Sequence, residues 1–428
     1  MKILIVAILT ALLLILIFVG MPIAFVLLII GTVGVWLVSG WDALMGIMGT
    51  TAYRSVNGFS YTTIPMFILM ANFISKSRIA EDLFDCILKW IGHKPGGVGV
   101  ATVFSSAAFG ALSGSSIAST SIMSKVAVPQ MIRSKYSDSF SAGLVASSSG
   151  TLAALIPPSV PLIVYAIQTE TSIGSLLISG IIPGLLLAFL LCIVVVAVAI
   201  KNGSVVERSS WKERLDSVKH IWPVLLLIFT VIIAIYTGIG TSTEAAAVGA
   251  FGALVIGFLI KRLNFKLMVE ALVETVKQTC MIFVILVGAT LFSYFIAFSR
   301  LGNSLISYIE STNLSPIGVV LLVILMYLIL GLFLDLFGSM LLTLPLVFPL
   351  ITGLGYDPIW FGIVVVLVLE IGLVTPPVGI NLYITSQQSG VSIKKVLQGS
   401  IPFIGVLLFV VFLIILFPEL VLYLPSKM

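Results

Sequence analysis

The sequence predicts an all-α, polytopic membrane protein, and three observations carry that prediction. Sixty per cent of the 428 residues are hydrophobic, only 9% are charged, and the mean hydropathy is +1.24. A soluble globular chain has about a quarter charged residues, so 22 basic and 17 acidic side chains could not cover a water-soluble body of this size. Apolar runs long enough to cross ~30 Å of hydrocarbon recur along the chain. The two halves of the chain also share an ordered set of motifs.

One charged linker, residues 201–220, divides the chain into halves, 1–200 and 221–428, and holds 8 charged residues in 20 positions. In the first half the predicted membrane segments are 3–19, 22–38, 61–76, 138–156, 157–168 and 175–200. In the second half they are 221–238, 243–260, 276–298, 359–374, 376–386 and 400–424. Segments 157–168 and 376–386 are short and begin with proline.

The distribution of cations predicts the orientation. With the linker in the cytoplasm and the segments alternating sides, 18 of the 22 Lys and Arg residues lie inside. Only Lys2, Arg54, Arg300 and Lys427 lie outside. Because cytoplasmic loops carry an excess of Lys and Arg, we expect both termini outside and the linker inside. The net charge of +5 then reflects membrane topology and gives no reason to expect a nucleic-acid partner.

Two stretches break the spanning pattern and predict re-entrant hairpins. Residues 98–133 are interrupted by Ser113-Gly114-Ser115-Ser116, and residues 316–353 are interrupted at 335–339. Each arm of the first stretch has about 15 residues, or ~22 Å as a helix, which is too short to cross. Inside-type cations flank it, so the first hairpin should enter from the cytoplasm. By the same alternation the second enters from outside.

An internal repeat relates the halves. Seven pairs of motifs recur in order at offsets of 219–222 residues. They pair Ser77-Arg78-Ile79 with Ser299-Arg300-Leu301, Gly110 with Gly331, Pro129 with Pro349, Tyr136 and Phe140 with Tyr356 and Phe361, Pro157-Pro158 with Pro376-Pro377, Ser172-Ile173 with Ser392-Ile393, and Ile182-Pro183 with Ile401-Pro402. The predicted topology puts equivalent pieces on opposite sides of the membrane. Inverted repeats with broken helices are typical of secondary transporters, whose site lies near the bilayer midplane.

The proline pairs Pro157-Pro158 and Pro376-Pro377 should interrupt two helices within the membrane. Proline removes a backbone donor and frees a carbonyl one turn earlier, and irregular backbone is tolerated at this depth only inside protein or along a wet cavity. Freed carbonyls suit Na⁺, and half-helix N-termini suit a carboxylate. A plain proline kink is the alternative, but the same feature beside both hairpin tips favours a functional break.

These elements predict two Na⁺ sites and one substrate pocket between the tips and the breaks. Na⁺ is a hard cation that needs several oxygen ligands. The predicted Na⁺ ligands are Ser113, Gly114, Ser148, Ser149 and Pro158 in the first site and Asp335, Gly338 and Thr375 in the second. The predicted substrate contacts are Ser115, Ser116, Ser159, Ser339, Thr375 and Asn381. Small-residue helix packing is the alternative explanation for the serine-rich tip.

Three acids need separate interpretation. Asp335 lies at the second tip, where a lone carboxylate is costly and indicates a function, although it could instead cap the second arm of the hairpin. Glu370 is a second intramembrane acid and could be a ligand, a proton carrier or a buried partner of tip amides. Glu244 lies near a membrane end, where snorkelling to the interface is as reasonable as function.

Several classes of protein are disfavoured. The three cysteines, Cys86, Cys192 and Cys280, show no metal-binding or disulfide spacing, and the two histidines stand beside charged segments. No GxxxxGK[ST] loop is present to bind ATP phosphates. Since no histidine lies in a predicted spanning segment to act as a base, we expect neither an enzyme nor an organic cofactor.

The chain resembles, over nearly its whole length, the large membrane subunit of tripartite ATP-independent periplasmic (TRAP) transporters. The matching segments are Gly20-Met-Pro-Ile-Ala-Phe25, Ile64-Pro-Met-Phe67, Gly110-Ala-Leu-Ser-Gly-Ser115, Leu155-Ile-Pro-Pro-Ser159, Thr243-Glu-Ala-Ala-Ala-Val-Gly249, Tyr356-Asp-Pro358 and Gly372-Leu-Val-Thr-Pro-Pro-Val-Gly379. The proline motifs and the Thr-Glu-Ala-Ala segment are specific together, and the others are weak singly.

The resemblance implies an elevator-type transporter of the bacterial inner membrane, with both termini periplasmic. It implies Na⁺-driven import of an organic acid of the sialic acid or C4-dicarboxylate type. It also implies two partners, a small four-helix membrane subunit and a periplasmic substrate-binding protein. Because this chain lacks four additional helices, the small subunit should be separate. The alternative function is an ion or solute channel built on re-entrant loops.

Overall fold

The computed structural model describes residues 2–202, 207–302, 304 and 314–428, and every regular element in these ranges is helical. In the first half the elements are α1 (Lys2–Phe18), α2 (Ile23–Ser39), α3 (Trp41–Arg54), η1 (Phe59–Thr62), α4 (Thr63–Lys76), α5 (Ile79–Ile91), α6 (Gly97–Ser113), α7 (Ser116–Arg133), α8 (Asp138–Leu155), α9 (Val160–Gln168), α10 (Ile173–Ser179) and α11 (Ile181–Asn202). In the second half they are α12 (Trp211–Tyr236), α13 (Ser242–Leu259), α14 (Phe265–Ser299), α16 (Pro316–Phe333), α17 (Leu336–Gly353), α18 (Pro358–Leu373), α19 (Ile380–Ser389), α20 (Ile393–Leu416), α21 (Glu419–Leu422) and η2 (Pro425–Lys427).

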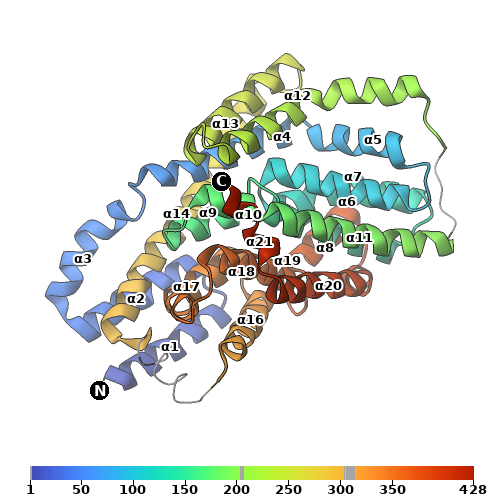
Figure 1. The fold of residues 1–428 in the computed structure, drawn as a ribbon. Coiled ribbons are helices and arrows are strands. Elements are labelled where there is room, and N and C mark those ends of the chain that lie inside the picture. Colours follow the sequence, from blue (N-terminus) through green and yellow to red (C-terminus); the bar gives the residue numbers. More distant parts are fainter. Residues whose placement is uncertain (1, 203–206, 303, 305–313) are drawn as a thin grey trace.

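The helices have the lengths and composition of a polytopic membrane protein. Among the described residues, six helical stretches are long and apolar enough to cross a bilayer, and the count rises to eight if each of two bent helix pairs is one span. One of these pairs is α8 and α9, which meet at 45°. The predicted all-α membrane fold is confirmed, and Figure 1 shows the helices gathered into one elongated body.

Some helices extend beyond the predicted segments. The helices α3 and α5 correspond to no predicted segment, because each mixes polar and apolar residues within 14 and 13 residues. Helix α14 begins at Phe265, before the predicted start at 276. Helix α12 begins at Trp211, inside the predicted linker, because Ser210 and Glu213 form a capping box that satisfies its first amides. Linker residues 203–206 lie outside the described residues.

The two halves of the chain interlock. Helix α2 packs on α14, α4 on α13, and α8 on α20, so each pair joins the first half to the second. Glycines permit the close approach: a Cβ at Gly31 of α2 would lie 2.7 Å from the backbone of Leu291 in α14. Gly143 of α8 and Gly399 of α20 face each other in the same way. Small residues let helix backbones approach closely in membranes, and this packing holds the halves together.

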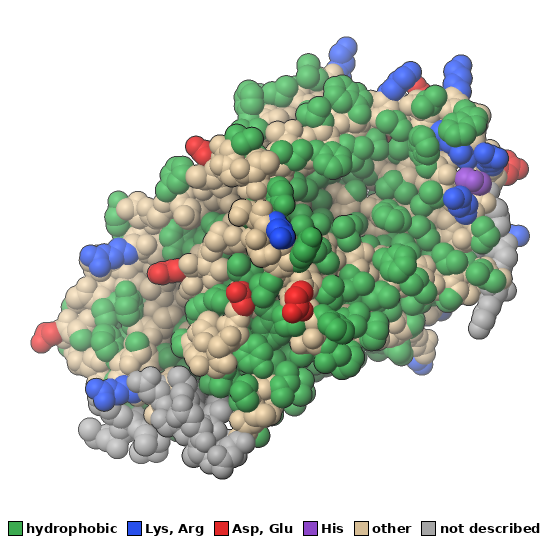
Figure 2. All heavy atoms as spheres, in the orientation of Figure 1, with side chains coloured by type: hydrophobic (Ala, Val, Ile, Leu, Met, Phe, Trp, Pro, Cys, Tyr) green, Lys and Arg blue, Asp and Glu red, His purple; other side chains and the backbone are tan. Residues whose placement is uncertain are grey.

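Charged side chains gather at one end of the body. Figure 2 shows most Lys and Arg at the end that carries α5 and the start of α12, beside a largely apolar face. Here Lys76 pairs with Glu274 at 2.7 Å, and Arg262 donates two hydrogen bonds to Asp82. This is the end that the cation distribution predicts to be cytoplasmic.

Candidate functional site

The two hairpins turn within a few residues at polar tips. Helix α6 ends at Ser113, Gly114 adopts a left-handed conformation (φ +56°), and the Ser115 hydroxyl accepts a hydrogen bond from the Ala118 amide at 3.4 Å. In the second hairpin Leu334 ends α16, and an Asp335 carboxylate oxygen accepts from the Gly338 amide at 3.3 Å. Asp335 therefore does cap α17, which was the structural alternative to a role in ion binding.

The helices containing the proline pairs stop at both predicted positions. Helix α8 ends at Leu155 and α9 starts at Val160, whereas α18 ends at Leu373 and α19 starts at Ile380. In the first break the Ser159 hydroxyl donates to Ala154 O at 2.5 Å and accepts from the Leu162 amide at 3.3 Å. Each break therefore leaves one helix C-terminus and one helix N-terminus side by side along the chain; residues 157–159 of the first break are buried, whereas Pro376, Pro377 and Val378 of the second are exposed.

The backbone at each tip is hydrogen-bonded to the break in the same half of the chain. The Val160 amide donates to Gly114 O at 3.1 Å, and the Val378 amide donates to Leu332 O at 3.2 Å. The arm before each tip also lies close to the broken helix, since a Cβ at Gly110 would be 2.7 Å from Ala153 Cα. A Cβ at Gly331 would likewise be 3.1 Å from Gly372 Cα. In each half, therefore, the hairpin contacts the broken helix that follows it.

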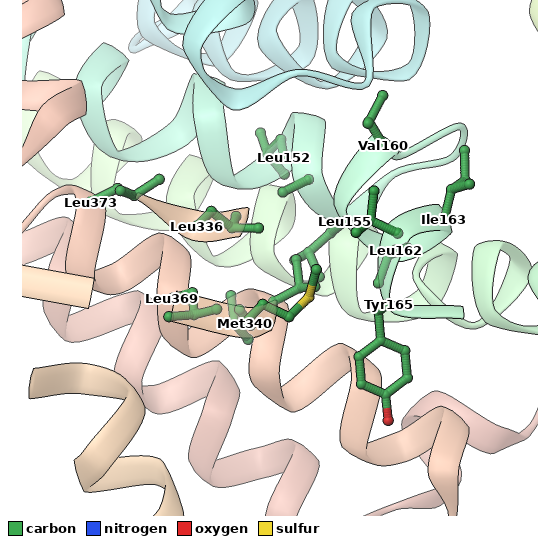
Figure 3. Packing of buried hydrophobic residues seen from close by; sticks show 14 of the residues in the cluster. Leu152, Leu155, Val160, Leu162, Ile163, Tyr165, Leu336, Met340, Leu369 and Leu373 are labelled. Atoms are coloured by element: carbon green, nitrogen blue, oxygen red, sulfur yellow. The ribbon is translucent and has the colours of Figure 1, made fainter. Parts of the chain in front are cut away.

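Apolar side chains surround the breaks. Figure 3 shows buried residues of α8 and α9, among them Leu155 and Leu162, gathered with Met340 of α17 and Leu369 of α18. All four are fully buried. This packing fixes the ends of the helices that frame the site and excludes water from the layer behind it.

A cavity of about 400 Å³ lies where the two tips meet. Its polar lining includes Ser113, Ser115 and Ser116 from the first tip and Asp335 from the second. Val160 and Pro161 line it from the first break, and Leu373 and Ile380 line it from the second. Helices α4 and α14 close the cavity and contribute Asn72 and Gln278. Segments more than 200 residues apart in sequence therefore build one site.

The cavity combines one carboxylate with several helix N-termini. Helices α7, α9, α17 and α19 all have first-turn residues in the lining, namely Ser116, Val160, Leu336 and Ile380. A helix N-terminus carries about half a positive charge and unpaired amide donors. Among the described lining residues Asp335 is the only charged side chain. The first-turn amides of α9 are already used, since Val160 bonds Gly114 O, Leu162 bonds Ser159 and residue 161 is proline. An anion could therefore meet amides only at the other three helices, and a cation could meet the carboxylate.

The predicted substrate residues separate into two groups. Ser115 and Ser116 line the cavity. Ser159 caps α9, Thr375 donates to Ile371 O at 2.6 Å, and Asn381 donates to the Ser116 hydroxyl at 3.1 Å from behind the lining. Ser339 is fully buried in α17. None of these four is among the lining residues, so the structure does not place them at the cavity surface.

The structure likewise brings only some of the predicted Na⁺ ligands to the cavity. Ser113 and Asp335 line the cavity, with Gly114 and Pro158 in contact beneath the first tip. Gly338 donates to Asp335 at the second tip. Ser149 bonds the Ser106 hydroxyl at 3.0 Å, and Ser148 is fully buried in the same helix without a hydrogen-bond partner among the described residues. The structure holds Thr375 at the second break.

Three features escaped sequence reasoning. Asn72 is the one amide side chain within the apolar run of α4, and it donates to Thr275 of α14 at 2.9 Å beside the cavity. Gln278 lies on α14 in a polar stretch that offered no distinguishing signal. The third feature is the partnership of Glu370: its carboxylate accepts from the Ser116 hydroxyl at 2.9 Å. Asn72 and Glu370 are each an isolated polar residue in an apolar helix, a signal that could have marked both, but their partners lie in distant segments.

Glu244 has a local structural role. It forms a capping box with Thr241 at the start of α13, accepting from the Thr241 amide at 2.7 Å. The side chain is exposed and does not reach the cavity. A capping box satisfies two otherwise unpaired helix amides, which accounts for this residue without a ligand.

Comparison with known proteins places the chain in a family. Residues 10–420 match the model of the DctM component of tripartite ATP-independent periplasmic transporters. The C4-dicarboxylate TRAP transporter large permease protein DctM of Pseudomonas aeruginosa is 35% identical over 377 residues, covering 87% of this chain and 88% of that protein. The sialic acid TRAP transporter large permease protein SiaM of Vibrio cholerae is 31% identical over 413 residues, 96% of each chain. The ectoine TRAP transporter large permease protein TeaC of Halomonas elongata is 32% identical and covers 95% of each.

The fold is also similar to that of a solved structure. The YdaH transporter of Alcanivorax borkumensis superimposes with a TM-score of 0.65 at 14% identity, covering 92% of this chain and 96% of that one. At this identity the likeness concerns the fold alone.

The helical fold, the apolar helices long enough to span a membrane and the cavity between the hairpin tips fit a membrane transport protein, and its relatives are named as permeases, not enzymes. The chain belongs to the DctM component family of tripartite ATP-independent periplasmic transporters.

Proposed function

We propose that this chain imports an organic carboxylate across the bacterial inner membrane, driven by Na⁺. One observation carries the proposal: four helix N-termini and Asp335 meet at a single cavity between the hairpin tips. The chain acts as the large permease subunit, with both termini in the periplasm. A separate four-helix membrane subunit and a periplasmic binding protein complete the system, as the family name and the related permeases suggest.

The helix N-termini support a carboxylate as the substrate. No Lys or Arg is among the described lining residues, so an anion would be held by backbone amides and by the Ser115 and Ser116 hydroxyls. Helix N-termini bind carboxylates in this way. Sialic acid and C4-dicarboxylates, which name two of the relatives, both carry this group. Ectoine, which names a third, carries it as well.

Asp335 supports coupling to Na⁺. A carboxylate in the lining of the cavity would repel the carboxylate of the substrate, and a bound cation removes that repulsion. We place one Na⁺ site at Asp335, Gly338 and Thr375, and a second at Ser113, Gly114, Ser148, Ser149 and Pro158. Na⁺ should therefore bind before the substrate and increase its affinity.

The paired hairpins and breaks support an elevator mechanism with inverted repeats. Because each tip is hydrogen-bonded to the break of its own half, the cavity could move as one body between the two sides. Such movement avoids exposing unsatisfied backbone to lipid, which costs several kcal/mol per group. Inverted repeats with two broken helices favour this arrangement over a channel, which would keep a continuous polar pore.

Uptake by proteoliposomes tests the proposal. The complete complex, supplied with sialic acid, succinate or ectoine, should accumulate one of them only when a Na⁺ gradient points inward. Dissipating the gradient should stop accumulation. Flux that follows the solute gradient alone and does not saturate would support the channel instead.

A further inference from the structure

A buried polar group adjoins the cavity and is used by neither proposed Na⁺ site. Glu370 lies in the last turn of α18 and is fully buried. One of its carboxylate oxygens, Oε2, accepts from the Ser116 hydroxyl at 2.9 Å, and the same hydroxyl oxygen accepts from Asn381 Nδ2 at 3.1 Å. The other carboxylate oxygen and Asn381 Oδ1 are buried without a hydrogen-bond partner among the described residues.

No cation compensates this carboxylate within the described part of the chain. The titratable or charged groups on the elements packed against α18 are Tyr327 on α16, Asp335 capping α17, Asp138 on α8, Tyr165 on α9, Tyr383 on α19, Lys394 and Lys395 on α20, and Glu419 on α21, with Asp357 capping α18 itself. None of these groups forms a hydrogen bond or ion pair with Glu370 in the described structure. Lys395, for example, pairs instead with Asp138 at 2.8 Å. An ionised carboxylate buried without a partner cation costs several kcal/mol, and it normally takes up a proton instead.

Ser116 connects this carboxylate to the cavity, and it has a single hydrogen to donate. When Glu370 is ionised, the hydrogen of the Ser116 hydroxyl is held by Glu370 Oε2 at 2.9 Å, so Ser116 offers the cavity only a lone pair. When the carboxyl carries a proton on Oε2, the direction of this hydrogen bond reverses and the carboxyl donates to Ser116. The Ser116 hydrogen is then released to point into the cavity, where a carboxylate can accept it.

We propose that Glu370 is a proton-binding site, linked through Ser116 to the binding of an anionic substrate in the cavity. One proton from solution bonds to the carboxylate, which becomes neutral, and Ser116 changes from an acceptor to a donor toward the substrate. Binding of the proton and the substrate therefore favour each other, and by linkage the coupling is reciprocal. This inference rests on the proposed function, since it takes the cavity ligand to be a carboxylate.

The protonation state can be measured without a substrate. Infrared difference spectra of the purified protein, recorded across a pH titration, should show the carbonyl stretch of a protonated carboxyl that is absent from Glu370→Gln. The variant Asp335→Asn, which removes the acid that lines the cavity, should keep the band. A band that disappears in Asp335→Asn and survives in Glu370→Gln would assign the proton to Asp335 and overturn the inference.

Coupling to the substrate is measured by binding. With Na⁺ saturating, and above the pH at which Glu370 titrates in the free complex, titration with sialic acid, succinate or ectoine in a weakly buffered solution should take up about one proton per molecule bound. Above the pH at which Glu370 titrates, the Kd should rise about tenfold per pH unit, as one linked proton requires. Glu370→Gln, which is permanently neutral and keeps a donor for Ser116, should bind without proton uptake and without this pH dependence.

Two further variants separate the possible outcomes. Ser116→Ala should keep the infrared band of Glu370 but lose the dependence of Kd on pH, because the connecting hydroxyl is gone. Glu244→Gln, in an exposed capping acid, should behave like the wild type. Binding of an acid with no proton uptake would overturn this inference and leave the proposed function standing. Failure of all three acids to bind would overturn the proposed function and this inference with it.

Discussion

At the scale of the residue, one side chain can serve both the fold and the site. Asp335 caps α17 through the Gly338 amide at 3.3 Å and is also the only charged side chain in the described lining of the cavity. The two interpretations that the sequence offered are therefore compatible. Capping occupies one oxygen of the Asp335 carboxylate. It also holds the carboxylate at the first turn of α17, beside the cavity.

Replacing Asp335 separates these roles. Asp335→Asn keeps a carbonyl oxygen that can cap α17 but removes the charge. We expect the Na⁺ concentration for half-maximal uptake to rise at least about tenfold, equivalent to ~1.4 kcal/mol, with little change in thermal stability. An unchanged Na⁺ activation curve would leave Asp335 as a helix cap only.

Gly150 of α8 should tolerate no side chain. A Cβ there would collide with the Ser116 hydroxyl and lie 2.5 Å from Asn381 Nδ2. Gly150→Ala should therefore destabilise the protein by about 1–3 kcal/mol, the usual cost of overpacking, and weaken substrate binding by displacing Ser116. Gly405→Ala is the matched control, because a Cβ at Gly405 meets no atom within 4 Å. Equal melting temperatures for the two variants would contradict the packing around Gly150.

At the scale of the element, the sequence predicted what depends on local chain chemistry. Breaks at the two proline pairs and turns at the two polar tips follow from missing amide donors and short apolar arms, and the structure has them at those positions. Sequence could not predict that α4 and α14 close the cavity or that Ser116 bonds Glu370, since these contacts depend on how distant helices pack. The amphipathic helix α5 was missed because no long apolar run marks it.

Movement of the first hairpin tip can be followed directly. Ser115 lies at the tip, partly exposed at the cavity, so a cysteine there should report which side the cavity faces. In Ser115→Cys, labelling from the cytoplasmic side should change when Na⁺ and substrate are added, because a ligand shifts the populations of states that bind it differently. Accessibility that ignores both ligands would contradict the elevator mechanism.

The start of α12 is docked onto the end of α5, and this contact should depend on pH. Arg214 of α12 lies 3.2 Å from His93 Nδ1 and 5.4 Å from the centre of the Trp211 ring. Partial burial, followed by repulsion from Arg214, lowers the pKa of His93 below its usual value. The folded protein disfavours the imidazolium form of His93. The contribution of His93 to the free energy of unfolding is therefore complete above about pH 6.5, and it is lost as the pH falls through the lower folded pKa. Thermal unfolding of His93→Gln should lack this acid-dependent loss, and identical pH profiles would contradict it.

At the scale of the whole molecule, the cation distribution predicts a topology that labelling can check. Ser209 lies just before α12 and Ser426 in the last turn of the chain. Single cysteines at these two positions should be labelled from opposite sides of the membrane in intact cells, with Ser209 inside and Ser426 outside. Labelling from the same side would contradict the inverted repeat.

The exposed apolar surface of α2, α12 and α13 is relevant to the predicted partner subunits. Large hydrophobic side chains such as Trp36, Phe229 and Phe251 are about half or more exposed on α2, α12 and α13. We predict that the purified chain alone does not accumulate substrate, and that adding the small subunit and binding protein restores accumulation. Full uptake by the chain alone would refute the tripartite assignment.

The interlocking of the halves has a consequence for how the protein is made. The partners of α2, α4 and α8 are α14, α13 and α20, which are synthesised up to about 260 residues later. The ribosome therefore delivers the first half to the membrane with three helix faces uncovered. The faces of α4 and α2 wait for α13 and α14, and the face of α8 waits for α20, the last long helix. Glycine-lined faces such as those of Gly31 and Gly143 attract other helices. A truncated product ending before Ile393 would leave α8 permanently without its partner.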